Sequence, residues 1–326
     1  MPANVTPEYE KAEQRYREAT TDEERLAALQ DMLATIPKHK GTEKMQADIK
    51  RRLSLLRRQQ QKPSARKGPD PFHIPKSGAG QVVLIGLPNT GKSSLLGVTT
   101  HAPAKVADYP FTTTVPQPGM WIKDDRPIQL VDTPPLTPEH IPPGLMGTIR
   151  NADLVCVVVE ATDAALDQAE AVLSVLSRRC LDLQTMPRTA LDAAQPSRRA
   201  ALLVANKLDL TGPHIVTPLC ELYAGRLEVI GVSARTGAGL EEWFNRLWEL
   251  LAVIRVYSKE PGRPPDLSKP FILPAGATVA DLARQIHRQL AQSMTFARLW
   301  GHSRFDGQQV PKTEVLHDRD IVEIHE

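Results

Sequence analysis

The stretch Gly86-Leu87-Pro88-Asn89-Thr90-Gly91-Lys92-Ser93, which reads GLPNTGKS, decides the fold of this chain. It fits the pattern G-x-x-x-x-G-K-[ST], follows the apolar run 81–85, and leads through Ser94 into a predicted helix. Gly86 and Gly91 let the backbone direct its N–H groups toward an anion, and the dipole of the following helix favours negative charge. A strand, a glycine loop and a helix in this order indicate a phosphate-binding loop rather than an ordinary Gly-Pro-Asn turn.

The side chains at the end of this loop have the chemistry that a nucleoside triphosphate requires. Lys92 is expected to reach the β- and γ-phosphates, and the hydroxyl of Ser93 to bind Mg²⁺. The other residues from Gly86 to Ser94 are expected to surround the phosphates. The loop therefore predicts binding of a nucleoside triphosphate together with Mg²⁺.

A second motif points to guanine as the base. The apolar run 201–205 is a predicted buried strand and ends in Asn206-Lys207-Leu208-Asp209. The Asp209 carboxylate can accept hydrogen bonds from guanine N1–H and from the exocyclic amine, which adenine does not present. Asn206 is expected to bond the N7 side of the base and to tie back to the phosphate loop, while the stem of Lys207 lies over the base. An ATPase is a distant alternative, because Asp209 would leave adenine unmatched.

Two further segments complete the predicted site. Ser233-Ala234-Arg235 follows the predicted strand 227–231, and its backbone is expected to touch guanine O6. The predicted strand 128–131 delivers Asp132, which can hold a metal-bound water. A threonine hydroxyl in the segment 108–114, which reads DYPFTTT, can complete the Mg²⁺ shell with Ser93.

Together these motifs resemble a known family. The set GLPNTGKS, DYPFTTTVPQPG, DTPP, NKLD and SAR is similar to the Obg superfamily of GTPases, which belongs to the TRAFAC class. The segments 269–279, 284–287, 297–301 and 320–324 resemble the TGS domain of its DRG branch, the developmentally regulated GTP-binding proteins. The resemblance covers nearly the whole chain and implies a GTPase that hydrolyses GTP to GDP and phosphate. In the family's pattern the Mg²⁺-binding threonine carries over to Thr113.

The order of predicted elements indicates the domain organisation. Alternating strands and helices in the centre of the chain predict an α/β fold, a P-loop NTPase with a doubly wound, mainly parallel sheet. The predicted regions are a basic helical region (1–62), a linker (63–80), a nucleotide domain closed by the helix 240–254 (81–257), a second linker (258–267) and a β-grasp or TGS domain (268–326). Relatives commonly carry an inserted domain ahead of the NKLD strand. The residues 181–199 are too few to form one, so the chain resembles a trimmed member.

The basic N-terminal region offers two interpretations. Helices are predicted over 7–19, 22–36 and 42–60, and from Lys38 to Lys67 there are 11 Lys or Arg against two acidic residues. These charges form either a solvated helix surface followed by a flexible linker, or a footprint for the phosphate backbone of RNA. No aromatic residue lies in this segment, so recognition of the shape or backbone of RNA is favoured over stacking on its bases. Together with the TGS domain, this region predicts that the protein binds the ribosome or a structured RNA. A protein partner is the alternative.

Composition indicates the compartment of the protein and argues against disulfide and metal sites. The chain has 326 residues, 41% of them hydrophobic, and a net charge of +2. No run of 18 apolar residues and no apolar leader is present, so a cytoplasmic protein without a membrane partner is expected. Cys156, Cys180 and Cys220 lack ligand or disulfide spacing and are expected to be reduced and mostly buried. The scattered histidines at 287, 302 and 317 favour packing or surface roles over metal binding.

Two departures from the family's pattern bear on catalysis. Asp132-Thr133-Pro134-Pro135 has proline where GTPases of this kind have glycine, whose N–H donates to the γ-phosphate. Proline has no N–H and a fixed φ, so sensing of the γ-phosphate by this loop is expected to be weaker. Leu136 stands where Ras-like enzymes place the glutamine that orients water. The sequence therefore predicts slow intrinsic hydrolysis.

Asn89 is a candidate to compensate for the absent glutamine. GTPases with a hydrophobic residue in place of that glutamine often use an asparagine at this position to bind K⁺, whose charge lies between the phosphates like an arginine finger. Asn89 equally suits a simple turn, because asparagine is common in turns. Two functions follow: a slow, K⁺-stimulated GTPase switch, or a GTP-binding adaptor for RNA or protein with little turnover.

Overall fold

The protein is described here by a computed structural model. The structure describes residues 6–18, 22–37, 42–61, 70–100, 114–190, 197–302 and 305–325. The chain divides into two compact units, Met1–Asp70 and Pro71–Glu326, and each is considered by itself.

The N-terminal unit has a small helical core of its own. Its described helices are α1 (Pro7–Glu18), α2 (Asp22–Thr35) and α3 (Glu43–Gln61). Apolar residues spaced three and four apart along α2 and α3 meet at this core, among them Leu29, Ile49 and Leu53, all of which are buried. The positions of the three helices match the sequence-based expectation to within two residues.

A mainly parallel sheet forms the centre of the second unit. Its strands are β1 (Gln81–Ile85), β2 (Gln117–Lys123), β3 (Arg126–Asp132), β4 (Leu154–Glu160), β5 (Asp182–Gln184), β6 (Arg198–Asn206) and β7 (Val229–Gly231). They lie in the order β2-β3-β1-β4-β6-β5, with β7 also paired to β6, and only the β2–β3 pair is antiparallel among them. The apolar runs of β1 and β4 are buried on both faces, as expected where helices cover a parallel sheet.

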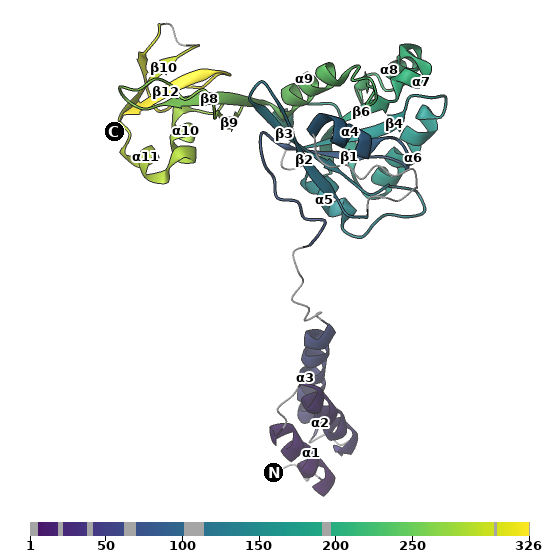
Figure 1. The fold of residues 1–326 in the computed structure, drawn as a ribbon. Helices are drawn as coiled ribbons and strands as arrows, with labels where there is room; N and C mark the ends of the chain where they lie inside the picture. The colour runs from purple at the N-terminus through teal and green to yellow at the C-terminus, as the bar shows by residue number, and fades with distance from the viewer. Residues whose placement is uncertain are drawn as a thin grey trace. The chain divides into compact units, whose positions relative to one another are not determined.

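Helices cover both faces of this sheet (Figure 1). The helices around it are α4 (Lys92–Thr100), α5 (Leu145–Asn151), α6 (Ala165–Arg178), α7 (Leu208–Thr211), α8 (Val216–Leu222) and α9 (Leu240–Leu251). The side chains of α4 and α9 share one apolar core, whereas α5, α6 and α8 share the other. In the first core the Trp121 ring packs 5.2 Å from Trp243 and 4.8 Å from Phe244, measured between centroids.

The register of the strands brings the predicted motifs to one edge. In the parallel pairs, Leu84 lies opposite Asp132 and Glu160 lies opposite Asn206. The strands that precede the phosphate loop, Asp132 and the NKLD motif therefore end side by side. This edge, formed by the carboxyl ends of the strands, is where ligands bind in open α/β sheets.

A second sheet follows in the same unit. Its strands are β8 (Val253–Lys259), β9 (Phe271–Pro274), β10 (Phe296–Trp300), β11 (Gln308–Val310) and β12 (Asp320–His325), in the order β11-β10-β12-β8-β9. The helices α10 (Val279–Ile286) and α11 (Arg288–Ser293) pack on it through a separate apolar core. Thr278 and Asp281 form a reciprocal capping box at the start of α10.

Several local expectations from the sequence are wrong. The helix expected over 240–254 ends at Leu251, because Ala252 takes a left-handed conformation with φ of 50° and β8 begins directly after it. β8 pairs with β9 and β12, so the expected linker 258–267 begins inside a strand of the second sheet. Cys180 and Cys220 are exposed rather than buried, whereas Cys156 is buried.

Candidate nucleotide-binding site

The phosphate loop joins β1 to α4, and two glycines set its shape. Gly86 and Gly91 have φ values of 157° and 86°. A Cβ at Gly86 would lie 2.3 Å from the carbonyl oxygen of Val158, and one at Gly91 would lie 2.2 Å from Nδ2 of Asn206. Both contacts are shorter than a Cβ can make, so the loop packs directly against the ends of β4 and β6.

Lys92 lies inside the curve of this loop. Its Nζ donates hydrogen bonds to the carbonyl oxygens of Gly86, at 3.2 Å, and Leu87, at 2.9 Å. The side chain is buried, and burial lowers the pKa of Lys92 to about 8, against the opposing attraction of Asp132. A positive charge that has lost its water here would gain strongly from an anion in the loop.

Ser93 and Asp132 bring two oxygen ligands together beside Lys92. The Ser93 hydroxyl donates to Oδ2 of Asp132 at 2.5 Å, and Asp132 is buried at the end of β3. Mg²⁺ prefers hard oxygen ligands, usually one or two from the protein with water and phosphate completing the shell. A serine hydroxyl beside a carboxylate fits that ion. Thr113, the third predicted ligand, lies outside the described residues.

Asn206 connects the phosphate loop to the predicted base-binding segments. Its Nδ2 donates to the carbonyl oxygen of Thr90 at 3.0 Å, and its Oδ1 accepts from the N–H of Ala234 at 3.1 Å. The side chain is buried, so these bonds hold three loops in register. The expected tie to the phosphate loop is present, and the bond to Ala234 is an addition.

Lys207 lies along the wall of the site. It adopts a left-handed conformation with φ of 69°, and its Nζ makes a 3.1 Å ion pair with Oε1 of Glu160 at the end of β4. A Cβ built on Gly91 would lie 4.0 Å from Cε of Lys207, so the stem of the lysine runs beside the phosphate loop. The ion pair fixes the direction of this stem.

Asp209 presents its carboxylate to the same space. Oδ1 accepts a hydrogen bond from the Ser233 hydroxyl, and Oδ2 pairs with Nε of Arg235 at 2.6 Å. The hydroxyl of Ser233 and then the guanidinium of Arg235 hold the pKa of Asp209 below its ordinary value. The group is therefore an acceptor-only carboxylate at neutral pH. The Arg235 side chain is 71% exposed, so it can leave Oδ2 without opening the fold.

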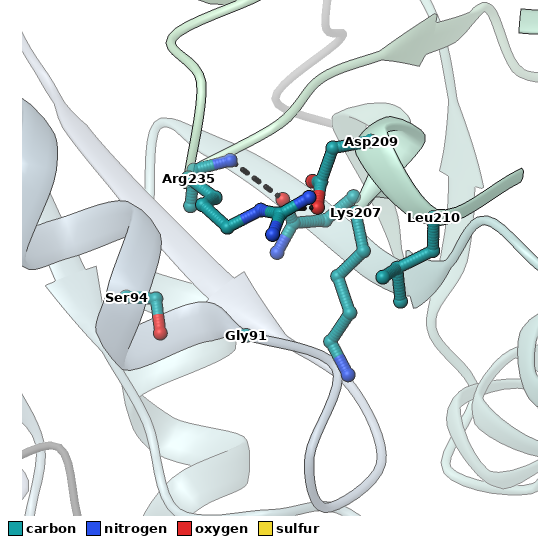
Figure 2. Close-up of a pocket in the computed structure, with 8 residues that line it drawn as sticks. Gly91, Ser94, Lys207, Asp209, Leu210 and Arg235 are labelled. Carbon is teal, nitrogen blue, oxygen red and sulfur yellow. Dashed lines mark hydrogen bonds and ion pairs between the residues drawn. The ribbon is translucent and has the colours of Figure 1, made fainter. Parts of the chain in front are cut away.

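Residues of the phosphate loop and of the predicted base-binding segments line one pocket of about 350 Å³ (Figure 2). Figure 2 shows Asp209 and Arg235 on one side of it and the phosphate loop with Gly91 and Ser94 on the other. The pocket is lined by Gly91, Ser94, Asn206, Lys207, Asp209, Leu210, Ala234 and Arg235. All but Leu210 were predicted from the sequence.

Two residues at this site were not predicted from the sequence. Leu210, which is 60% exposed, forms part of the pocket wall next to Asp209. Glu160 holds Lys207, as described above. Both could have been inferred, since Leu210 directly follows the NKLD motif and Glu160 ends the strand beside it.

The segment after Asp132 is bonded to the phosphate loop and to itself through its backbone amides. Pro135 is buried and has no N–H, and the next amide, that of Leu136, donates to the carbonyl oxygen of Gly86 at 3.1 Å. The Thr137 amide donates to the carbonyl oxygen of His140 at 3.2 Å. The amides at 136 and 137 both donate to backbone carbonyls, so in this structure neither takes the place of the donor missing at Pro135.

The Leu136 side chain belongs to the core and not to the pocket. It is fully buried in the cluster that includes Leu145 and Ile149. We therefore expect Leu136→Gln to destabilise the protein by about 2–4 kcal/mol, because an amide would be buried among apolar groups. It is not expected to accelerate GTP hydrolysis. Urea unfolding and phosphate release measure the two effects.

The volume-conserving change Leu136→Met is the control for this prediction, with an expected cost below about 1.5 kcal/mol. Faster hydrolysis in Leu136→Gln at unchanged stability would show that residue 136 reaches the nucleotide.

Comparisons with known proteins agree with this geometry. Residues 81–195 match the family model described as 50S ribosome-binding GTPase, and residues 254–326 match the TGS domain. The chain is 28% identical to Developmentally-regulated G-protein 2 of Arabidopsis thaliana, over 92% of this chain and 90% of that protein. It is 26% identical to GTP-binding protein 1 of Schizosaccharomyces pombe and 25% identical to Developmentally-regulated GTP-binding protein 2 of Homo sapiens, over 92% of this chain and 98% of each.

The length of these relatives accords with a trimmed chain. The Arabidopsis alignment spans 361 positions, more than the 326 residues here, so that protein has segments that this chain lacks. The described helices include none that is long and apolar enough to span a bilayer. With the nucleotide domain, the second sheet and these relatives in agreement, the chain combines a GTPase domain with a following TGS domain and is similar over 92% of its length to GTP-binding proteins of the developmentally regulated (DRG) family.

Proposed function

We propose that this protein is a slow, Mg²⁺-dependent GTPase that acts as a switch on the ribosome or another structured RNA. The observation that carries the proposal is the placement of the Asp209 carboxylate across one pocket from the phosphate loop. That arrangement would accommodate a guanine base at Asp209 and its phosphates at the loop.

Recognition of guanine would rest on Asp209. A carboxylate held ionised by Ser233 can accept from two donors on one edge of the base. Guanine would have to displace the Arg235 guanidinium from Oδ2, and this exposed side chain has room to do so. Asn206 would position the surrounding loops through its bonds to Thr90 and Ala234.

Binding of the phosphates would rest on the loop amides and on Lys92. The ammonium now satisfied by the carbonyls of Gly86 and Leu87 would transfer its hydrogen bonds to phosphate oxygens. Ser93 and Asp132, with Thr113 from the family's pattern, would hold Mg²⁺. When bound, this ion would neutralise negative charge on the phosphates.

The expected rate is low because the described residues offer few groups to the attacking water. The amides of Leu136 and Thr137 are occupied, and the Leu136 side chain is in the core. The same facts favour the second candidate, a GTP-binding adaptor for RNA or protein with little turnover. The two candidates share the pocket and differ only in hydrolysis.

Multiple-turnover phosphate release, measured beside GTP and GDP affinities, separates these candidates. We expect slow but repeated turnover and unequal affinities for the two nucleotides, as a switch requires. Tight binding of both nucleotides without product would instead assign the protein to the adaptor class.

Potassium is expected to stimulate hydrolysis through Asn89. This residue has φ of 65° and an exposed side chain in the phosphate loop. Glycine tolerates the same backbone conformation, so Asn89→Gly removes the side-chain oxygen without straining the loop. We expect turnover at least several-fold faster in K⁺ than in Na⁺ for the natural protein, and equal rates for the variant, at unchanged GDP affinity.

Equal turnover of the natural protein in the two salts would remove the proposed K⁺ site and leave Asn89 as a turn residue.

The partner would be held in part by the exposed basic side chains of α3. Of the predicted segment 38–67, the structure describes Lys50, Arg51 and Arg52 as exposed, with Arg52 paired to Asp48 at 2.7 Å. Charges of one sign on one helix attract a phosphate backbone without reading its sequence. The side chains from 55 to 67 lie outside the described residues.

A further inference from the structure

A cluster of arginines lies at the opposite end of the nucleotide domain from the pocket. The chain contains two Ser-Arg-Arg segments, 177–179 at the end of α6 and 197–199 at the start of β6. Pairing of β5 with β6 brings them together, since Asp182 lies opposite Arg198 and its N–H donates to the carbonyl oxygen of Ser197 at 2.8 Å. This edge is formed by the amino ends of the strands, far from the predicted nucleotide.

Two arginines build the scaffold of this cluster. Arg150, in the last turn of α5, donates to the carbonyl oxygen of Arg179 at 2.8 Å. Arg199 donates from Nε and from one terminal nitrogen to the carbonyl oxygen of Arg150, at 2.9 and 2.7 Å. Burial and then the charge of Arg150 lower the pKa of Arg199, as expected where guanidinium groups are close together.

Three arginines of the cluster remain for another role. Arg178, Arg179 and Arg198 are exposed, and none forms an ion pair with a carboxylate of the described residues. Two carboxylates at the amino ends of the neighbouring strands β4 and β5 are already paired: Asp153 with Lys76 at 2.6 Å, and Asp182 with Arg226 at 3.6 Å. Excess positive charge is therefore concentrated at this edge of the sheet.

We propose that Arg178, Arg179 and Arg198 form a binding surface for the phosphate backbone of structured RNA, separate from the N-terminal region and the TGS domain. Guanidinium groups bind phosphate oxygens with two parallel hydrogen bonds, and the hydroxyls of Ser177 and Ser197 supply further donors. The described part of this surface carries no aromatic side chain, which favours duplex backbone over stacked single strands. The inference rests on the proposed action on RNA and adds a contact made by the nucleotide domain itself.

The test uses the full-length protein and a short RNA duplex, with binding measured by fluorescence anisotropy over a range of salt concentrations. The triple variant Arg178→Glu, Arg179→Glu and Arg198→Glu is expected to bind roughly 100-fold more weakly and to lower the salt slope of log K by about 2–3. The matched triple change of the same residues to lysine keeps the charge and is expected to retain most of the affinity. GDP affinity should be unchanged in both variants, because the pocket lies at the other end of the sheet.

Three outcomes would overturn the inference. Unchanged affinity and salt slope in the glutamate variant, while Lys50→Glu with Arg51→Glu abolishes binding, would remove this surface but keep the action on RNA. Absence of duplex binding by the natural protein would remove both. Loss of binding to poly-glutamate in the glutamate variant, with duplex binding unchanged, would assign the surface to acidic protein chains.

Discussion

Asp209→Asn is expected to weaken GTP and GDP binding at least about 100-fold, because hydrogen bonds to a charged acceptor contribute about 1.5–3 kcal/mol each. The asparagine amide cannot accept from both guanine donors, and its NH₂ would face one of them. Xanthine has a carbonyl where guanine has the exocyclic amine, so the variant should gain affinity for xanthosine nucleotides. Isothermal titration with GDP and XDP measures both changes.

Asp266→Asn is the matched control, because Asp266 is exposed, bonds only its neighbour Ser268 among the described contacts, and lies outside the pocket lining. It should leave both affinities unchanged. Full GDP affinity in Asp209→Asn would show that the base does not pair with this carboxylate, and the assignment of guanine would then need another residue.

Lys92→Met is expected to have opposite effects on binding and on stability. Loss of the ammonium should weaken GTP binding roughly 100-fold or more, since charge-assisted hydrogen bonds to phosphate are stronger than hydrogen bonds between neutral groups. In the absence of nucleotide the variant should be more stable than the natural protein at pH 7, by up to about 3 kcal/mol, because it no longer buries a charge. Chemical unfolding with and without GDP separates the two effects.

The pH dependence of stability gives an independent test of Lys92. Its pKa is about 8 in the folded protein and 10.5 is its ordinary value. Between these values the unfolded chain holds more protons than the folded one, so stability without nucleotide should rise as the pH increases from about 8 to 10.5. In Lys92→Met this rise should disappear, whereas in the exposed control Lys269→Met it should persist. The same rise in all three proteins would contradict the burial of the charge.

Much of the fold and the pocket could be predicted from the sequence, because the signals are local. The pattern of residues 86–93 requires glycine where the backbone turns and lysine beside the expected phosphates, and both requirements are visible in one short segment. The NKLD and SAR motifs follow apolar runs that become β6 and β7. A buried strand followed by a polar motif is sufficient to place that motif at the edge of the sheet.

Predictions of boundaries failed where tertiary contacts override local preference. The residues 253–259 continue the apolar pattern of α9, but they become β8 because β9 and β12 supply its hydrogen-bond partners from far along the chain. Leu136 was assigned by its position in the motif. Its burial in the core depends on α5, which no local pattern around Leu136 reveals.

The sequence by itself determined the class of ligand, the base and the order of the two sheets, since these follow from residue types at fixed spacing. Only the tertiary structure decided which groups are engaged: the amide of Leu136 on Gly86, the guanidinium of Arg235 on Asp209, and the two Ser-Arg-Arg segments side by side. The physical reason is that hydrogen bonds and ion pairs depend on distances between residues remote in the chain, and pairing of strands sets those distances.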